Sequence, residues 1–426
     1  MSRGGGMLAI VDCNNCYASC EEIFEPKLAG KPVIILTNND GQAIAKNQLA
    51  KSLEIDYSIP YHQLKPTLDT FGVVALSSNY TLYGDISARI MRMLHHFCPD
   101  MEVYSIDEAF LNFDSFHHAD LINYAKEIRA SILNGIGMPV SIGLAHTKTL
   151  CKIANRYVKK HDREVGVFAI DSEEKRLELL KLTPINDIWG VGGKLTVRLN
   201  KLGIKTAYDL SLVKPDWARR NLTIVGERMI RELNGQRCID LEYIPKRKDI
   251  IASQKSFGKY TDNYQFMQQA LATYTSRCAE KLRKQNSVCC QIQVIVQTNS
   301  WNTKEKQYFN SISCKLDIPT SHTPTIIKFA IKGLESIFKA GFTYKRVGIM
   351  LMDLRDKSDG TQNLFVQEDR TKNDKIMNVI DRINKMNGTN SIRYGTMGYN
   401  SEKWKMKQNL LTRCYTTRIS DLIKIY

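Results

Sequence analysis

Short apolar runs alternate with helix-like segments over the first 170 residues, and this alternation limits the possible folds more than any other feature of the sequence. Five apolar runs bounded by turn signals predict β-strands: residues 8–11, 33–36, 73–76, 101–106 and 140–144. Between them, apolar side chains recur at helical spacing over residues 86–97 and 121–132. Such elements bury their apolar faces by packing in layers, so the pattern predicts an α+β or α/β layer structure.

The pattern of apolar residues changes several times along the chain, and a length of 426 residues suggests two to four domains. Turn signals indicate a small subdomain at 21–74, and glycine-broken helical periodicity indicates a helical domain at 171–240. Residues 253–353 predict a second α+β domain, with helices and strands in the following ranges: helices at 267–284 and 325–338, and strands at 291–296, 309–316 and 347–351. Residues 354–426 form a polar tail that ends in a helix-like stretch.

Charge and hydropathy indicate the kind of partner. The chain has 60 Lys and Arg against 44 Asp and Glu, a net charge of +16. Residues 253–353 contribute 14 basic and 6 acidic residues, so half of the excess positive charge lies in that segment. This charge makes a polyanion such as nucleic acid the leading candidate partner. No apolar run approaches the roughly 20 residues of a membrane span, and the first apolar stretch runs into Asp12, so a cytoplasmic protein is expected.

Acidic residues interrupt two of the predicted strands. Asp12 follows the run at 8–11, and Asp107 and Glu108 follow the run at 101–106. Three carboxylates at one sheet edge repel one another unless cations neutralise them, and hard oxygen ligands suit Mg²⁺. Two such ions could activate a hydroxyl and stabilise a leaving pyrophosphate. The alternative is that these carboxylates cap helices or meet surface lysines, and adjacent Asp107 and Glu108 require a turn or bulge to face the same way.

Several sequence blocks together resemble the Y-family DNA polymerases, and the resemblance runs from residue 7 to residue 418. The most specific block is Ser-Ile-Asp-Glu-Ala at 105–109. The other blocks lie at residues 12–20, 30–33, 77–80, 83–85 and 143–152. The resemblance implies a multidomain α+β right-hand polymerase with these parts: a catalytic palm at 7–20 and 75–170, small fingers at 21–74, a helical thumb at 171–240, a DNA-binding little finger at 253–353 and a C-terminal tail at 354–426.

The same resemblance implies roles for individual residues. Asp12, Asp107 and Glu108 are expected to be the catalytic carboxylates that bind two Mg²⁺ ions, with the carbonyl of Cys13 as a further metal ligand. Tyr17 resembles the steric gate of the family, an aromatic ring that leaves no room for a ribose 2′-hydroxyl; its alternative is core packing.

Two lysines and two peptide motifs complete the expected site. Lys51 and Lys152 stand where the family places cations on the incoming triphosphate, although solvated surface lysines are the alternative. The glycine-rich stretch at 189–194 lacks phosphate-loop spacing and resembles a helix-hairpin-helix, which holds a DNA phosphate through backbone amides; a plain helix connection is the alternative. Leu364 and Phe365 resemble the apolar end of a sliding-clamp-binding peptide, against the alternative of an ordinary loop.

These features together predict an error-prone, template-directed DNA polymerase for translesion synthesis in the DNA damage (SOS) response. Its expected substrates are primer-template DNA and deoxynucleoside triphosphates. Its expected partners are a processed UmuD-like dimer, a recombinase filament and the sliding clamp, with no membrane, in a nucleoid-associated cytoplasmic location. A two-metal nuclease and a non-catalytic DNA-binding relative are the rival hypotheses. The nuclease would cleave DNA in Mg²⁺ without nucleotides, and the binding relative would lack the carboxylates.

Overall fold

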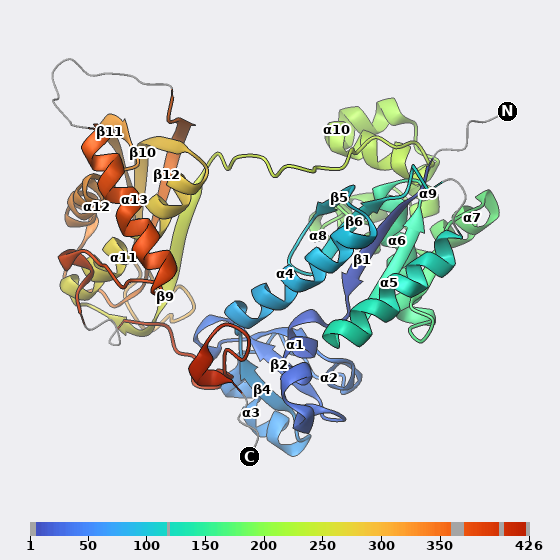
Figure 1. The fold of residues 1–426 in the computed structure, drawn as a ribbon, viewed down its shortest axis with the longest axis horizontal. Helices are drawn as coiled ribbons and strands as arrows, with labels where there is room; N and C mark the ends of the chain where they lie inside the picture. The colour runs from blue at the N-terminus through green and yellow to red at the C-terminus, as the bar shows by residue number, and fades with distance from the viewer. Residues whose placement is uncertain (1–5, 117–119, 359–369, 400–403, 423–426) are drawn as a thin grey trace. The chain divides into compact units, whose positions relative to one another are not determined.

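The computed structural model describes residues 6–116, 120–358, 370–399 and 404–422 (Figure 1). The chain divides into two compact units. The first comprises Met1–Thr37, Gln42–Pro245 and Leu410–Tyr426, and the second comprises Asn38–Gly41 and Lys246–Asn409. Each unit contains β-sheet, helices and its own apolar core, so the predicted multidomain α+β class is confirmed.

A five-stranded sheet forms the centre of the first unit. Its strand order is β5-β6-β1-β7-β8, and the strands are β1 (Leu8–Cys13), β5 (Met101–Val103), β6 (Glu108–Asn112), β7 (Val140–Ala145) and β8 (Val167–Ala169). The central strand β1 pairs antiparallel with both β6 and β7. Its side chains alternate between two separate apolar clusters, Ala9 and Val11 in one and Leu8 and Ile10 in the other. Burial on both faces explains why β1 is a continuous apolar run in the sequence.

Helices cover both faces of this sheet. On the side of Ala9 and Val11 lie α1 (Cys16–Phe24), α4 (Tyr80–Phe97) and α5 (Leu121–Ile136). On the other side lies α6 (Lys148–His161). The N-cap residues of α4, α5 and α6 are Asn79, Asp120 and Thr147. Each N-cap side chain accepts a hydrogen bond from a backbone amide of the first helical turn. The cap residues thus fix where each helix enters the layer.

A smaller sheet and a group of helices complete the first unit. The sheet has the order β3-β2-β4 and its own apolar cluster. Its region contains η1 (Pro26–Leu28), β2 (Val33–Leu36), β3 (Ala43–Lys46), α2 (Gln48–Ser52), α3 (Tyr61–Thr70) and β4 (Val74–Ser77), and the 3₁₀ turn η2 (Asn38–Asp40) lies between β2 and β3. The helical group contains α7 (Glu173–Leu182), η3 (Ile185–Asp187), α8 (Gly193–Lys201), α9 (Ala207–Ser211) and α10 (Pro215–Leu233). Its apolar residues join the cluster that α6 forms with β1.

The second unit is a four-stranded antiparallel sheet with helices on one face. The strand order is β11-β10-β12-β9. The elements are β9 (Ile251–Thr261), α11 (Tyr264–Lys284), β10 (Ser287–Thr298), β11 (Phe309–Thr320), α12 (Thr323–Ile337), β12 (Tyr344–Asp356), α13 (Arg370–Met386) and η4 (Gly395–Met397). Along β10, Ile292, Val294 and Val296 enter the core beneath α11 and α12. The alternating residues Gln291 and Gln293 therefore face the other side of the sheet.

Most of the predicted elements are confirmed, but the C-terminal tail is not simply polar chain. The helix α13 was missed in the sequence, although its apolar residues Ile376, Val379, Ile380 and Ile383 recur at helical spacing. Residues 410–421 belong to the first unit and include the 3₁₀ turn η6 (Ile419–Asp421). The final residues of the predicted helix-like stretch, 423–426, lie outside the described residues. The short strands β3 and β8 were also missed. No helix within the described ranges is both long enough and apolar enough to cross a bilayer.

Candidate active site

Asp12 and Glu108 lie side by side at one end of the five-stranded sheet. In the antiparallel pairing of β1 with β6, Asp12 is directly opposite Glu108. Residues that face each other across an antiparallel pair present their side chains on the same face of the sheet. This face also carries Ile10 and Phe110, which pack with α6, so both carboxylates point toward the side that α6 covers.

Asp107 lies in the turn that brings the chain into β6. The Ser105 hydroxyl donates a hydrogen bond of 2.5 Å to Asp107 Oδ1 and accepts one from the amide of Glu108 at 3.1 Å. The amide of Cys13 donates to the carbonyl of Asp107 at 2.9 Å, which fixes this turn against the end of β1. The strand β5 ends at Val103 and β6 begins at Glu108. The turn that Asp107 and Glu108 require in order to face the same way therefore lies between these two strands.

Two lysines from α6 reach the carboxylates. Lys152 Nζ lies 2.9 Å from Glu108 Oε1, and Lys159 Nζ forms an ion pair with Asp12 Oδ1. The two lysines are seven residues apart, or nearly two helical turns, and therefore lie on one face of α6. Sequence reasoning selected Lys152 but missed Lys159, although this seven-residue spacing on an amphipathic helix was visible in the sequence.

The electrostatics show that the three carboxylates act on one another. Burial raises the pKa of Asp12 to about 7; the Lys159 ammonium opposes this rise, whereas the negative charges of Glu108 and Asp107 add to it. Among the residues that the structure describes, no three His, Cys, Asp or Glu side chains are grouped closely enough to hold a metal ion. The oxygen donors are nevertheless of the kind that divalent cations prefer, and two of the carboxylates now face ammonium groups, which cations could replace.

Tyr17 borders this site from the first turn of α1. Its ring stacks on Tyr83 at 4.7 Å between centroids with 14° between planes, and the edge of Tyr80 lies 5.8 Å away. The side chain is half-buried, and burial raises the pKa of Tyr17, with the charge of Asp107 as a further cause. Tyr17 is thus an aromatic wall near the carboxylates, held from behind by a second ring.

Lys51 lies in a small polar cavity beside Asp12. The cavity measures about 140 Å³ and is lined by Asn14, Asn15, Lys51, Lys159 and Arg163. Lys51 Nζ donates a hydrogen bond of 2.5 Å to Asn15 Oδ1. Desolvation lowers the pKa of Lys51, and the nearby charges of Arg163 and Lys159 lower it further. Three cationic side chains therefore share this cavity. Lys152 does not line it, and its Nζ lies 4.5 Å from the centroid of the Tyr104 ring. Arg163 was not selected from the sequence either.

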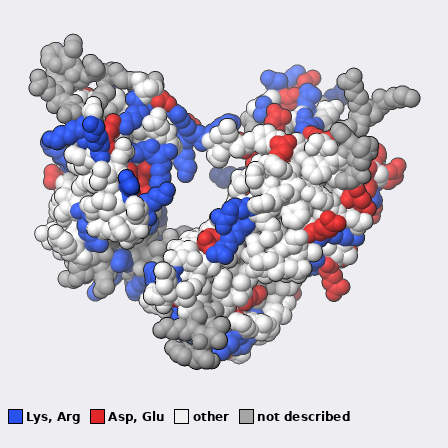
Figure 2. Space-filling model, viewed as in Figure 1, with Lys and Arg blue, Asp and Glu red and all other residues white. Residues whose placement is uncertain are grey.

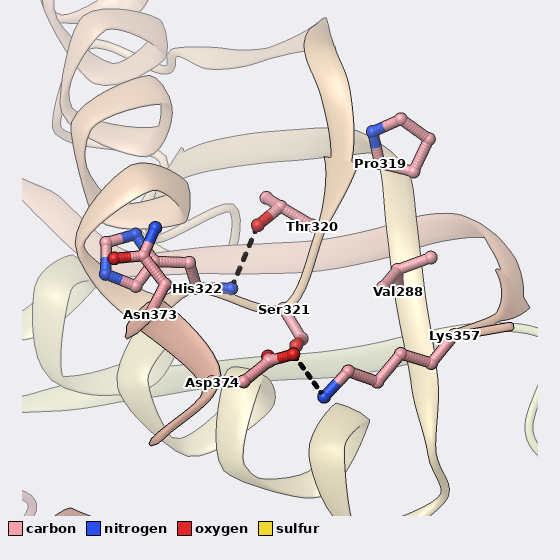
Figure 3. Close-up of a pocket in the computed structure, with 8 residues that line it drawn as sticks. All are labelled: Val288, Pro319, Thr320, Ser321, His322, Lys357, Asn373 and Asp374. Atoms are coloured by element: carbon pink, nitrogen blue, oxygen red, sulfur yellow. Dashed lines mark hydrogen bonds and ion pairs between the residues drawn. The ribbon is translucent and has the colours of Figure 1, made fainter. Parts of the chain in front are cut away.

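The remaining predicted residues lie elsewhere. Leu364 and Phe365 fall within 359–369, outside the described residues. A separate pocket of about 110 Å³ in the second unit lies between β10, the end of β11 and α13 (Figure 3). There Lys357 is paired with Asp374 at 2.8 Å, and the amide of His322 donates to the hydroxyl of Thr320 at 3.1 Å. This pocket contains no paired carboxylates and is a less suitable site for the chemistry predicted here.

The fold matches that of solved Y-family DNA polymerases. A Y-family chimera of Dbh and Dpo4 superposes with a TM-score of 0.64 at 20% sequence identity, covering 82% of this chain and 99% of the chimera. Dbh DNA polymerase in an insertion ternary complex superposes with a TM-score of 0.52 at 20% identity, with the same coverage. These superpositions show that the chain has the fold of the Y-family DNA polymerases.

Sequence comparison identifies the branch. Residues 11–156 match the impB/mucB/samB family, residues 247–364 match its C-terminal domain, and residues 374–425 match a domain of unknown function (DUF4113). The chain is 40% identical to Protein UmuC of Salmonella typhimurium strain LT2, over 98% of this chain and all of UmuC. It is 38% identical to Protein SamB of Salmonella typhimurium, over 98% of this chain and 99% of SamB. The chain belongs to the impB/mucB/samB family of Y-family translesion DNA polymerases, and the predicted resemblance to the Y-family DNA polymerases is confirmed.

Proposed function

We propose that this DNA-directed DNA polymerase extends primers across damaged template bases, as part of the SOS response, through Asp12, Asp107 and Glu108. The observation that carries the proposal is the direct pairing of Asp12 with Glu108 beside the turn that holds Asp107. Three acidic side chains at one end of a sheet repel one another and favour cations. Burial raises the pKa of Asp12, and the charges of Glu108 and Asp107 add to this rise, which agrees with this arrangement.

These carboxylates, with the carbonyl of Cys13, would hold two divalent cations such as Mg²⁺. Bound there, the cations would favour ionisation of the primer 3′-hydroxyl and neutralise the leaving pyrophosphate. The chain itself supplies the acidic oxygens and holds them in place through the β1–β6 pairing and Ser105. The ammonium groups of Lys152 and Lys159 would leave the carboxylates when cations bind and become available to substrate.

The neighbouring residues suit a deoxynucleoside triphosphate. Lys51, Lys159 and Arg163 line one cavity, and such a cation cluster suits the phosphate groups. Tyr17 would exclude a ribose 2′-hydroxyl by its bulk. Lys152 remains a candidate triphosphate ligand, but its contacts with Glu108 and the Tyr104 ring favour a role beside the carboxylates.

The rest of the chain offers surfaces for primer-template DNA. We assign the palm to 7–20 and 75–170, the fingers to 21–74, the thumb to 171–240 and the little finger to 253–353. In the thumb, α8 begins at Gly193 after Gly192, without a side-chain cap, as a helix-hairpin-helix that holds a phosphate would. On the visible face of the unit that contains the little finger, more Lys and Arg than Asp and Glu can be seen (Figure 2).

The proposed partners follow from the relationship to UmuC rather than from contacts in this chain. They are a processed UmuD-like dimer, a recombinase filament and the sliding clamp, the last bound through Leu364 and Phe365. We propose a location in the cytoplasm with the nucleoid, which DNA as the substrate supports.

Primer extension tests the proposed function. The full-length chain, with and without a UmuD-like partner, should add deoxynucleotides to a primer in Mg²⁺ on an undamaged template and on one with an abasic site. The rival nuclease would instead shorten labelled DNA in Mg²⁺ without nucleotides. Cleavage without extension would reject the polymerase proposal in favour of that rival, and binding without either reaction under all conditions would favour the non-catalytic relative.

The salt dependence of DNA binding tests the little-finger assignment. On the strands, Lys315 and Arg346 alternate with core residues and so lie on the face opposite α11 and α12. If this face contacts phosphates, the variant Lys315→Gln with Arg346→Gln should flatten the slope of log affinity against log salt by up to about 2. The measurement is fluorescence anisotropy on primer-template DNA between low and moderate salt.

A charge-matched control distinguishes phosphate contacts made by this sheet face from a general effect of positive charge. Lys328 and Lys332 are exposed on α12, on the helical side of the same sheet. The variant Lys328→Gln with Lys332→Gln loses the same charge and should leave the slope nearly unchanged. Equal slopes for the two double variants would show that the open sheet face is not the principal phosphate contact.

A further inference from the structure

The last described segment of the chain packs on the first unit and is called here the C-terminal strap, residues 410–421. It begins beside β4, where the amide of Ser77 donates to the carbonyl of Leu410 at 2.9 Å and the amide of Leu410 donates to the Ser77 hydroxyl at 3.0 Å. The Leu410 side chain packs against the apolar cluster of the three-stranded sheet. The strap falls within the matched domain of unknown function and is therefore a candidate for assignment.

The strap holds the start of α4. Asn79, only 3% exposed, caps this helix by accepting a hydrogen bond from the amide of Leu82. The Asn79 side-chain amide donates to the Thr412 hydroxyl at 3.1 Å and to the carbonyl of Arg413 at 3.1 Å. One buried side chain therefore both begins α4 and binds the strap.

The strap also holds the end of α1. The ring of Tyr415 stacks on Phe24 at 5.1 Å with 9° between planes, and its hydroxyl donates to Glu25. The backbone amide of Glu25 in turn donates to the carbonyl of Glu21, a fully buried residue of α1, at 3.0 Å. The end of α1 is thus fixed by a segment nearly 400 residues later in the chain.

Asn79 connects the strap to the aromatic wall of the candidate active site. The backbone amide of Tyr83, a fully buried residue of α4, donates to the carbonyl of Asn79 at 3.0 Å, and its hydroxyl donates to Glu21 Oε1 of α1 at 2.6 Å. The ring of Tyr83 is the surface on which Tyr17 stacks. A continuous set of contacts therefore runs from Thr412 through Asn79 and Tyr83 to Tyr17.

We propose that the C-terminal strap is a positioning element for sugar discrimination, in which Thr412 acts through Asn79 and Tyr83 to hold the Tyr17 ring against the sugar of a nucleoside triphosphate. This inference rests on the proposed role of Tyr17 as the steric gate. A ring excludes a single hydroxyl only if its position is fixed to within about 0.5 Å. Because the strap contacts both α1 and α4, it fixes the two helices whose side chains build the gate.

The test uses single-nucleotide primer extension by the full-length chain, comparing the efficiencies for a ribonucleotide and the matching deoxynucleotide. Thr412→Val keeps the shape of the side chain but removes the hydroxyl. We expect the ribonucleotide-to-deoxynucleotide ratio to rise roughly fivefold, the equivalent of one neutral hydrogen bond, while deoxynucleotide efficiency stays within a factor of about three. Tyr83→Phe keeps the stacked ring, removes its bond to Glu21 and should raise the ratio in the same direction.

Two further variants make the result decisive. Thr417 is an exposed threonine of the strap, so Thr417→Val is the matched control and should keep the parent ratio. Tyr17→Ala reports on the gate itself: if it leaves the ratio unchanged, the proposed function of Tyr17 fails and the inference fails with it. If Tyr17→Ala raises the ratio but Thr412→Val and Tyr83→Phe do not, the strap inference alone is rejected. An equal loss of both activities together with a lower melting temperature, or a matching change in Thr417→Val, would also reject it and leave the strap a purely structural element.

Discussion

Replacing Glu108 with Gln is expected to lower the rate of nucleotide addition by about 10³-fold while primer-template affinity stays nearly unchanged. Gln keeps the size of the side chain but removes the negative charge that we assign to cation binding. Neutralisation of developing charge by bound cations stabilises a phosphoryl-transfer transition state by several kcal/mol, so one lost ligand is sufficient for this loss. DNA affinity depends mainly on basic residues elsewhere in the chain, which the change leaves in place.

Stability should be little affected by this change. The Glu108–Lys152 ion pair is partly exposed, with side-chain exposures of 19% and 17%, and pairs of this kind contribute at most about 1 kcal/mol. The measurements are single-turnover extension, DNA anisotropy and melting temperature. Glu178→Gln, an exposed position on α7, makes the same chemical change away from the site and should behave as the parent. Extension by Glu108→Gln at the parent rate would remove Glu108 from the catalytic assignment, and Asp107→Asn gives an independent check of its neighbour.

Replacing Tyr17 with Ala is expected to increase ribonucleotide incorporation relative to deoxynucleotide incorporation by about 10²-fold. This is the magnitude by which a closely fitting apolar pocket rejects an added hydroxyl. The substitution removes the ring but no charge, so the carboxylates and the Lys51 cavity should be unaffected. The deoxynucleotide, which needs no extra room, should be incorporated with little loss.

Core packing of Tyr17 predicts a different outcome. Truncating a buried aromatic residue costs roughly 3 to 5 kcal/mol and would lower the melting temperature and both activities together. Tyr17 is half-buried against Tyr83, so part of this cost is expected in either case, and the sugar ratio is the deciding measurement. Tyr399→Ala removes an exposed ring, 89% accessible, and serves as the control for loss of a tyrosine. A fixed ratio with a collapsed melting temperature would identify Tyr17 as a core residue.

The local pattern of apolar residues was sufficient to predict most of the helices and strands. The run at 33–36 is the strand β2, and the predicted helix at 267–284 corresponds to α11 with three residues added at its start. These segments are long or strongly apolar, so their periodicity is clear. The strand β3 was missed because it is short and only partly buried. The helix α13 was missed although its apolar residues recur at helical spacing, because the segment was assigned to the polar tail as a whole.

The amino-acid sequence by itself determined which carboxylates to consider, because Asp12, Asp107 and Glu108 interrupt apolar runs and lie in specific family blocks. It also determined the need for a turn before Glu108, since neighbouring strand residues point to opposite faces. Both inferences depend on short stretches of chain, where residue order fixes geometry.

Only the tertiary structure decided which residues meet these carboxylates and what supports the gate. Lys159 contacts Asp12, and Lys152 contacts Glu108, because α6 packs across the face of the sheet that β1 and β6 share. Thr412 of the strap contacts Asn79, across a sequence separation that no local pattern records. Contacts of this kind depend on how buried faces pack together, and packing is a property of the whole folded chain rather than of any window of its sequence.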